Sequence, residues 1–188
     1  SATEQGSSAD GPETADAGED PDAVEEQDGA EDPAGEDAGS EDAVSGGPPA
    51  IAPAVDQLDA ARVVIEREDD GHVEVAARLA ADGDARRRGL MGVEELPDGT
   101  GMLFTWDGGE REGGFWMKDT LISLDIAFAG RDGRIEAILT MLPCESDPCP
   151  TYDPQTAYVA ALEVPGGWFE DNDVEVGDHL TWTRIDDR

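Results

Sequence analysis

The chain contains little lysine, histidine, cysteine or aromatic residue, and it has no long apolar run. One of its 188 residues is lysine, two are histidine, two are cysteine and 5% are aromatic. A transmembrane helix needs about 20 consecutive apolar residues, and no segment approaches that length, so the chain as given should not span a membrane. The sequence also lacks the spacing of a Walker phosphate loop and the Gly-x-Ser-x-Gly nucleophile motif.

The scarcity of ligating side chains bears on metals and cofactors. Two cysteines are too few for a structural zinc site, and both histidines are far from them in sequence. The acidic loop at residues 170–173 offers oxygen ligands but does not match the calcium-binding EF-hand pattern. We therefore predict neither a metal site nor a cofactor.

Positive charge is scarce too, whereas acidic residues are abundant along the whole chain. The sequence holds 46 Asp and Glu against 12 Lys and Arg, for a net charge of −34. Residues 1–55 carry 16 of the acids and no Lys or Arg, which leaves 30 acids against 12 bases in the rest. We expect neither nucleic acid nor an anionic membrane as a partner. The preference for arginine over lysine is typical of extreme halophiles, although an acidic protein from a GC-rich organism would share it.

Residues 1–57 are predicted to form a disordered acidic tail and linker. Between Ser1 and Ala50 the only hydrophobic side chains larger than alanine are Val24 and Val44, too few to offset the entropy cost of ordering the backbone. Such polar leaders follow the anchoring cysteine of many surface lipoproteins. A lipid anchor upstream of Ser1 is therefore one interpretation, and a solubilising tail without an anchor is the other.

Cys144 and Cys149 flank a short loop rich in turn-forming residues and are predicted to form a disulfide. Their spacing is not that of the redox C-x-x-C motif. Because disulfides persist in oxidising compartments, the pair indicates an extracytoplasmic location, on the cell surface or secreted. Two free thiols in a cytosolic loop are the alternative.

Residues 58–188 have the pattern of one mainly β domain. Short runs of alternating apolar residues are separated by Gly, Pro and Asp. Residues 63–79 should form a hairpin with Asp69-Asp70-Gly71 as its turn, and the clearest strand pair lies within residues 122–141. Asp82 or Asp84 can cap a short helix that includes Arg86–Arg88, and Gly89 is placed to end it. We predict a jelly-roll-like β-sandwich or a partly open barrel with one or two short helices.

Five short motifs follow one another along this domain: Arg88-Gly89-Leu90-Met91, Gly101-Met102-Leu103-Phe104, Phe115-Trp116-Met117-Lys118-Asp119-Thr120, Leu124-Asp125-Ile126 and Leu162-Glu163-Val164. Together they resemble the uncharacterised DUF192 family, also called UPF0127, over about residues 62–183. The resemblance implies a mostly β domain, often exported or envelope-anchored, with no established activity. The chain departs from the family pattern at Ser123, where proline is common, and at Val93, where a basic residue is frequent.

Lys118 is a candidate site residue because a chain with eleven arginines keeps its single lysine inside the densest motif. Strand alternation predicts that Lys118 shares a face with Trp116, and Asp125 or Glu163 are the acids expected nearby. An ammonium beside an aromatic ring suits a carboxylate or sugar-like ligand, or acid/base chemistry. The structural alternative is that Lys118 and Asp125 form an ion pair or hydrogen bonds that brace a loop, with Trp116 in the core.

Arg88 is the second candidate, since it carries motif support within the only positive cluster, Arg86–Arg88. A guanidinium group suits a carboxylate or phosphate, and pairing with the protein's own acids is the alternative. The predicted ligand-binding residues are thus Arg88, Trp116, Lys118, Asp125 and Glu163.

These patterns lead us to expect an extracytoplasmic binding or accessory domain that recognises a small polar ligand, a glycan or an envelope partner protein. Two alternatives stay open. One is an enzyme that uses Lys118 with Asp125 or Glu163 as an acid/base pair, and the other is a purely structural envelope protein. We favour binding over catalysis because residue types alone supply no catalytic geometry.

The net charge predicts that stability depends on salt. Repulsion between surface acids reaches about 10 Å at 0.1 M salt and only about 3 Å at 1 M, so the free energy of unfolding should rise with salt concentration. Urea titrations in dilute and in molar KCl measure this rise. Equal stability in both would refute the halophile interpretation.

Overall fold

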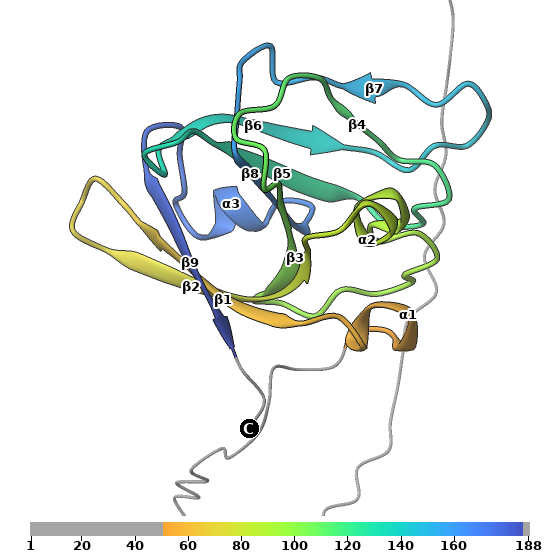
Figure 1. Ribbon diagram of the computed structural model, residues 1–188, viewed down its shortest axis with the longest axis horizontal. Coiled ribbons are helices and arrows are strands. Elements are labelled where there is room, and N and C mark those ends of the chain that lie inside the picture. Colours follow the sequence, from red (N-terminus) through yellow and green to blue (C-terminus); the bar gives the residue numbers. More distant parts are fainter. Residues whose placement is uncertain (1–50, 186–188) are drawn as a thin grey trace, which may run out of the picture. The chain divides into compact units, whose positions relative to one another are not determined.

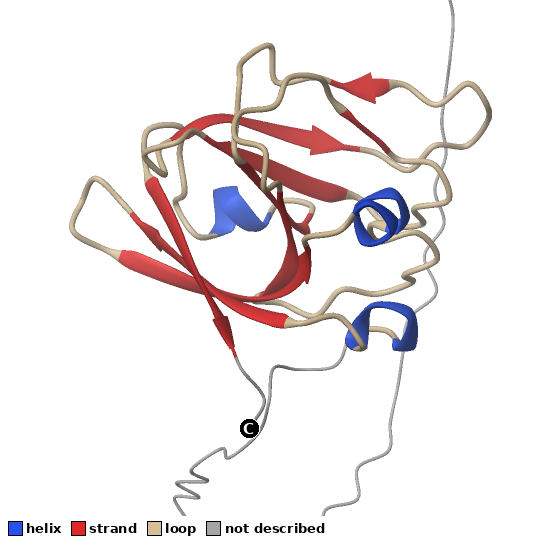
Figure 2. Ribbon diagram, in the orientation of Figure 1, coloured by secondary structure: helices blue, strands red, loops and turns tan. Residues whose placement is uncertain are grey.

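The computed structural model describes residues 51–185, which form a strongly curved sheet with three short helices (Figures 1 and 2). The tail predicted for residues 1–57 falls outside the described part up to residue 50. Its last residues are structured, because helix α1 begins at Pro53 and ends at Asp56. The other helices are α2 (Gly83–Arg88) and α3 (Trp168–Asp171). The strands are β1 (Ala60–Glu66), β2 (His72–Ala80), β3 (Thr100–Thr105), β4 (Phe115–Trp116), β5 (Leu124–Ala129), β6 (Ile135–Met141), β7 (Thr151–Tyr152), β8 (Ala160–Pro165) and β9 (His179–Ile185).

The main sheet has seven strands in the order β6-β5-β8-β3-β2-β1-β9, and β4 pairs separately with β7. Neighbouring strands are antiparallel except for β2 and β3, which are parallel and connected through α2. The two edges of the sheet approach each other at one end, where Arg134 and His179 form a single bridge and the amide of Ile135 donates to the carbonyl of Asp178 at 2.8 Å. The mainly β prediction is confirmed, in the form of an incompletely closed, barrel-like sheet.

The β1–β2 hairpin shows how alternation in the sequence sets the register. Val63 faces Val75 across the pair, and both are fully buried. The turn between the strands places Asp70 at a φ of 65°, and the Asp69 side chain accepts a hydrogen bond from the Gly71 amide at 2.9 Å. Asp tolerates this left-handed conformation better than most residues, so the hairpin predicted at this position forms without strand slippage.

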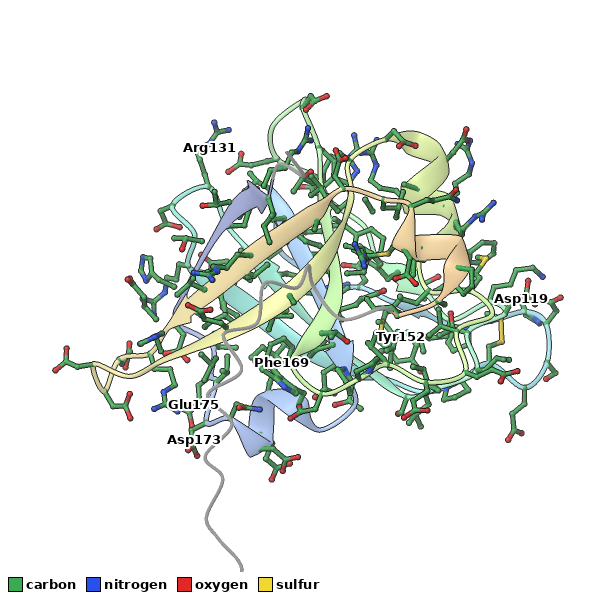
Figure 3. The ribbon with its side chains drawn as sticks, turned by 90° about the horizontal axis from the view of Figure 1, so that it is seen from below. Asp119, Arg131, Tyr152, Phe169, Asp173 and Glu175 are labelled. Carbon is green, nitrogen blue, oxygen red and sulfur yellow. A yellow bond between two sulfur atoms is a disulfide. The ribbon has the colours of Figure 1, made fainter. Side chains whose placement is uncertain are left out.

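The sheet separates two apolar cores. The concave face packs around α3, whose Trp168 and Phe169 join Val63, Leu103 and Leu162 in one cluster. Phe169, labelled in Figure 3, packs between α3 and the strands. The other face is covered by α2, the segment after it and β4, so α2 and α3 lie on opposite sides of β3 (Figure 1).

The predicted disulfide is confirmed between Cys144 and Cys149, with an S–S distance of 2.12 Å and a Cα–Cα distance of 5.5 Å. It closes the loop that joins β6 to β7. The Asp147 carboxylate within this loop lies 3.4 Å from the Nζ atom of Lys118, which ties the loop to the segment after β4.

Removing the ring of Phe169 tests the contribution of α3 to the concave core. Phe169→Ala leaves a cavity in a fully enclosed position, so we expect a loss of about 3–5 kcal/mol in the free energy of unfolding. Val176→Ala, at a position where the side chain is 56% exposed, is the matched control and should change stability by less than about 0.5 kcal/mol. Urea unfolding at constant KCl measures both, and a Phe169→Ala effect as small as the control would contradict the packing described here.

Candidate ligand-binding cleft

A cleft of about 420 Å³ opens on the face of the sheet that carries α2 and β4. It continues into a smaller pocket of about 30 Å³, here called the inner pocket. Both volumes share walls formed by Arg86, Arg87, Phe104, Phe115 and Trp116. The outer cleft is further lined by Gly83, Trp106, Arg111, Glu112, Gly113, Gly114 and Tyr158, and the inner pocket by Arg88, Gly89, Leu90, Met91, Thr120 and Glu163.

Aromatic rings form the floor and one wall of the outer cleft. The ring of Phe115 lies edge-on to Phe104 at 5.0 Å, and Trp106 lies edge-on to Tyr158 at 5.5 Å. The hydroxyl of Tyr158 donates to the Gly113 carbonyl at 3.0 Å, and burial is the main cause that raises the pKa of this phenol above its ordinary value. Trp116 is different because 53% of its surface is exposed on the rim. An exposed indole beside fixed rings is a surface on which a sugar or planar ligand can stack.

Helix α2 brings three consecutive arginines to this cleft. Asp82 caps the helix by accepting hydrogen bonds from the amides of Asp84 and Ala85 at 2.8 and 2.9 Å. The bond from Ala85 is the main cause that lowers the pKa of the Asp82 carboxyl. Gly89 ends the helix at a φ of 51°, a conformation that glycine adopts without strain. This six-residue helix is thereby fixed at both ends, with Asp82 as the cap of the two candidates and Gly89 at the predicted end.

The four arginines of the cleft differ in what they contact. Arg86 donates to the carbonyl oxygens of Ala81 and Thr105, and its guanidinium lies 5.5 Å from the Trp106 ring centre. Arg87 pairs with Asp84. Arg111 lies 5.9 Å from the same indole, on its own side of the cleft.

Arg88 differs from these neighbours. Within residues 51–185 its guanidinium forms no ion pair or hydrogen bond, and the side chain is exposed. Arg88 is therefore the arginine of α2 that can bind a carboxylate or phosphate without giving up another contact.

Glu163 lies in the wall of the inner pocket, in the middle of β8. Its neighbours across the sheet are Met102 on β3 and Ile126 on β5, and only 5% of its surface is exposed. No hydrogen bond or ion pair involves its carboxyl among the described residues. Burial raises the pKa of Glu163 from 4.5 to about 8. The carboxyl is thus mainly neutral at pH 7 and can donate a hydrogen bond as well as accept one.

Segments distant in sequence meet around the inner pocket. The segment after α2 is fastened to the segment after β4 by a hydrogen bond from the Gly92 amide to the Asp119 carbonyl at 2.8 Å. Apart from Arg86 and Arg87, every residue that lines the inner pocket belongs to one of the motifs quoted above: Arg88, Gly89, Leu90, Met91, Phe104, Phe115, Trp116, Thr120 and Glu163. The motifs therefore converge on one small volume.

Three of the five predicted ligand-binding residues come together there, namely Arg88, Trp116 and Glu163. Lys118 is not among the lining residues; strand β4 ends at Trp116, so the expected alternation does not continue to Lys118, whose ammonium pairs with Asp147 instead. Sequence alternation could not reveal that the strand is only two residues long.

Asp125 lies on the opposite, concave face of the sheet from Glu163. Its partners across β5 and β8 show this, because Asp125 is level with Val164 while Ile126 is level with Glu163. The carboxylate is 4% exposed and accepts hydrogen bonds from the Thr140 hydroxyl and the Gly167 amide, both at 2.8 Å. It fixes the start of α3, and the structure does not bring it together with Glu163.

Sequence reasoning missed Trp106, Arg111 and Tyr158 as cleft residues. Arg111 and Tyr158 form an isolated bridge, with the Arg111 amide donating to the Tyr158 carbonyl at 2.7 Å, and this contact closes the far wall. The two residues are 47 positions apart in the sequence. A local pattern carries no signal for such a pairing.

Within the described part of the chain, no three His, Cys, Asp or Glu side chains are grouped so that they could hold a metal ion. No helix among residues 51–185 is both long and apolar enough to cross a membrane.

The position of Glu163 predicts a pH-dependent stability. Between about pH 4.5 and pH 8 the unfolded chain has released this proton and the folded chain retains it. The contribution of Glu163 to stability therefore falls by about 1.4 kcal/mol per pH unit over this range. Glu163→Gln removes this titrating group. The free energy of unfolding of the variant should therefore increase relative to that of the wild type as the pH rises toward 8. Urea unfolding in molar KCl from pH 5 to 9 measures the difference.

The matched control for this measurement is Glu112→Gln, which removes an exposed acid from the rim of the outer cleft. A difference between wild type and Glu163→Gln that stays constant with pH would show that the Glu163 carboxyl is ionised in the folded protein.

Comparisons with known proteins bear on the family to which the chain belongs. The sequence profile of DUF192, described as "Uncharacterized ACR", matches residues 64–182. A protein of unknown function from Novosphingobium aromaticivorans DSM 12444 has a similar crystal structure, with 30% identity and a TM-score of 0.63 over 71% of this chain and 92% of that one. A proposed transcription regulator from Sinorhizobium meliloti 1021 is 29% identical, with a TM-score of 0.61 over 66% of this chain and 95% of that one. No curated protein matches significantly. On the profile match, which spans more than half of its length, the chain belongs to the DUF192 family.

Proposed function

We propose that this protein is an extracytoplasmic binding module whose cleft holds a small acidic, sugar-like ligand. The observation that carries the proposal is the convergence of Arg88, Trp116 and Glu163 on one pocket, although they lie as much as 75 positions apart in the sequence. Residues that served only packing would have no reason to leave a guanidinium, an indole and an unpaired carboxyl around the same open volume.

The chemistry of the cleft selects the class of ligand. The exposed face of Trp116, beside Phe115, suits the flat apolar face of a sugar ring. The guanidinium groups of Arg88 in the inner pocket and Arg111 in the outer cleft suit a carboxylate or a phosphate. A neutral glycan would leave these arginines unused, so we favour a glycan that carries acidic groups, such as a uronate.

The disulfide and the charge support the proposed extracytoplasmic location. Cys144 and Cys149 are bonded, which favours an oxidising compartment. The acidic surface supports a salt-rich environment, in which only short-range contacts to a charged ligand keep their strength.

Two other functions receive less support. An acid/base pair made of Lys118 with Asp125 or Glu163 is not assembled, since the lysine pairs with Asp147 and the two acids face opposite sides of the sheet. Transcriptional regulation is the description given to the relative from Sinorhizobium meliloti 1021. For this chain a net charge of −34 would oppose binding to nucleic acid.

Binding can be tested by isothermal titration calorimetry with trigalacturonate in molar KCl at neutral pH. We expect Trp116→Ala to weaken binding by a few-fold to about tenfold, as the loss of one stacking surface implies. Arg111→Gln should weaken it as well, because one of the guanidinium groups facing the carboxylates is removed. Maltotriose, which has no carboxylate, should bind more weakly than trigalacturonate.

The matched controls are Trp182→Ala and Arg62→Gln, which remove an indole and a guanidinium from the strands β9 and β1, away from the cleft. Both should bind as wild type does. Wild-type binding that none of the cleft variants weakens, or no binding of any acidic sugar tested, would refute the proposed function.

A further inference from the structure

We propose that the inner pocket is an acid-binding subsite in which a ligand carboxylate lies between the Arg88 guanidinium and the carboxyl of Glu163, with Glu163 donating its proton as a hydrogen bond. Binding is then coupled to one proton held by the protein. This inference rests on the proposed function, since it assigns one acidic group of the ligand to a defined place in the cleft.

The size of the inner pocket limits what can enter it. A volume of about 30 Å³ exceeds the roughly 10–15 Å³ that one water molecule requires but is far too small for a sugar ring. A single carboxylate group is of the right size. Because Phe115 and Trp116 line both volumes, the ring that carries this carboxylate can stay in the outer cleft against the aromatic wall.

The charged groups around the pocket leave one arginine available. The charged or titratable residues that line it are Glu163 and the three arginines of α2. Arg86 is held by two backbone carbonyls and Arg87 by Asp84, so Arg88 is the cation that can approach a bound anion.

The remaining walls contribute no further charge. The segments packed on this side of Glu163 supply Leu90, Met91, Phe104, Phe115, Trp116 and Thr120, and the neighbours of Glu163 on β3 and β5 are Met102 and Ile126. A carboxylate entering the pocket therefore meets the arginines of α2, of which Arg88 is the one without a partner among the described residues, and the carboxyl of Glu163.

In such surroundings the protonation state of Glu163 decides whether an anion can bind. A neutral carboxyl donates a short, charge-assisted O–H···O⁻ hydrogen bond to the ligand. An ionised Glu163 would instead place two like charges within a few ångströms of each other, which disfavours binding of the anion. The pKa of Glu163 in the free protein is raised to about 8, so the proton is present at neutral pH and is lost in mildly alkaline solution.

The expected behaviour follows from linkage between the proton and the ligand. Below about pH 7 the subsite is protonated and the dissociation constant should not change with pH. Above about pH 8 the ligand must restore the proton as it binds, so the dissociation constant should rise toward tenfold per pH unit. The carboxylates of a uronate stay ionised across this range, so the ligand itself adds no such dependence.

The test is calorimetry with trigalacturonate in molar KCl from about pH 6.5 to pH 9.5, on the full chain and on Glu163→Gln. We expect the wild-type dissociation constant to rise at least tenfold between about pH 7 and pH 9.5, with uptake of up to one proton per ligand in the alkaline range. Glu163→Gln keeps a hydrogen-bond donor, so it should bind within a few-fold of wild type at pH 7 and show no such rise.

Two controls separate the possible results. The trimethyl ester of trigalacturonate offers no anion to the subsite, so any binding it shows should be independent of pH. Arg88→Gln should weaken trigalacturonate binding and leave the ester unaffected. Circular dichroism at each pH verifies that every variant is folded.

The outcomes are distinct. Wild-type binding that does not change between about pH 7 and pH 9.5, or an alkaline loss that Glu163→Gln shares, overturns the subsite and leaves the binding function in place. Failure of trigalacturonate and other acidic sugars to bind at any pH overturns the proposed function, and the subsite with it.

Discussion

Three neighbouring strands, β5, β8 and β3, are buried on both faces, and the rest of the structure depends on this constraint. A strand of this kind must place apolar side chains on both sides, one set toward the concave core around α3 and the other toward α2 and β4. The segments that cover the second face are irregular, and they leave a cleft where they do not meet. A strand that is buried on both faces requires other segments to pack on each face. On the outer face these segments are loops and very short helices and strands, and the cleft lies between them.

Glu163 breaks this apolar rule at the centre of the arrangement. Its neighbours on β8, Leu162 and Val164, pack into the concave core, and a carboxyl on the other face can remain only in its neutral form or with a partner. A leucine at the same position would bury more apolar surface and would have no ionisation to suppress. The retention of an acid here is hard to explain by stability, which is why the inner pocket carries the functional argument and Asp125, fully hydrogen-bonded at the start of α3, does not.

Much of the local structure could be predicted from the sequence. Alternation gave the β1–β2 and β5–β6 hairpins, Asp82 and Gly89 gave the limits of α2, and the spacing of Cys144 and Cys149 gave the disulfide. These features depend on contacts between residues close in sequence. Alternation also shows which residues of one strand share a face. Which residues of β5 and β8 lie on the same face of the sheet depends on the pairing register, so the placement of Asp125 and Glu163 on opposite faces could not be predicted. The emphasis on Lys118 came from its rarity, and rarity carries no information about position. The walls supplied by Trp106, Arg111 and Tyr158 depend on a long-range bridge that no local pattern encodes.

The cleft arginines also have a consequence for how a ligand arrives. They form a small positive region on a molecule whose net charge is −34, so an approaching anion is first repelled by the whole protein and is attracted only at contact. For most anion-binding proteins added salt weakens capture by screening attraction. Here the long-range interaction between the protein and an anion is repulsive, so salt weakens a repulsion. The hydrogen bonds within the inner pocket act at distances shorter than the screening length and are affected less. Added salt should therefore raise the rate at which an anion reaches this cleft, because it weakens the repulsion from the surrounding acids.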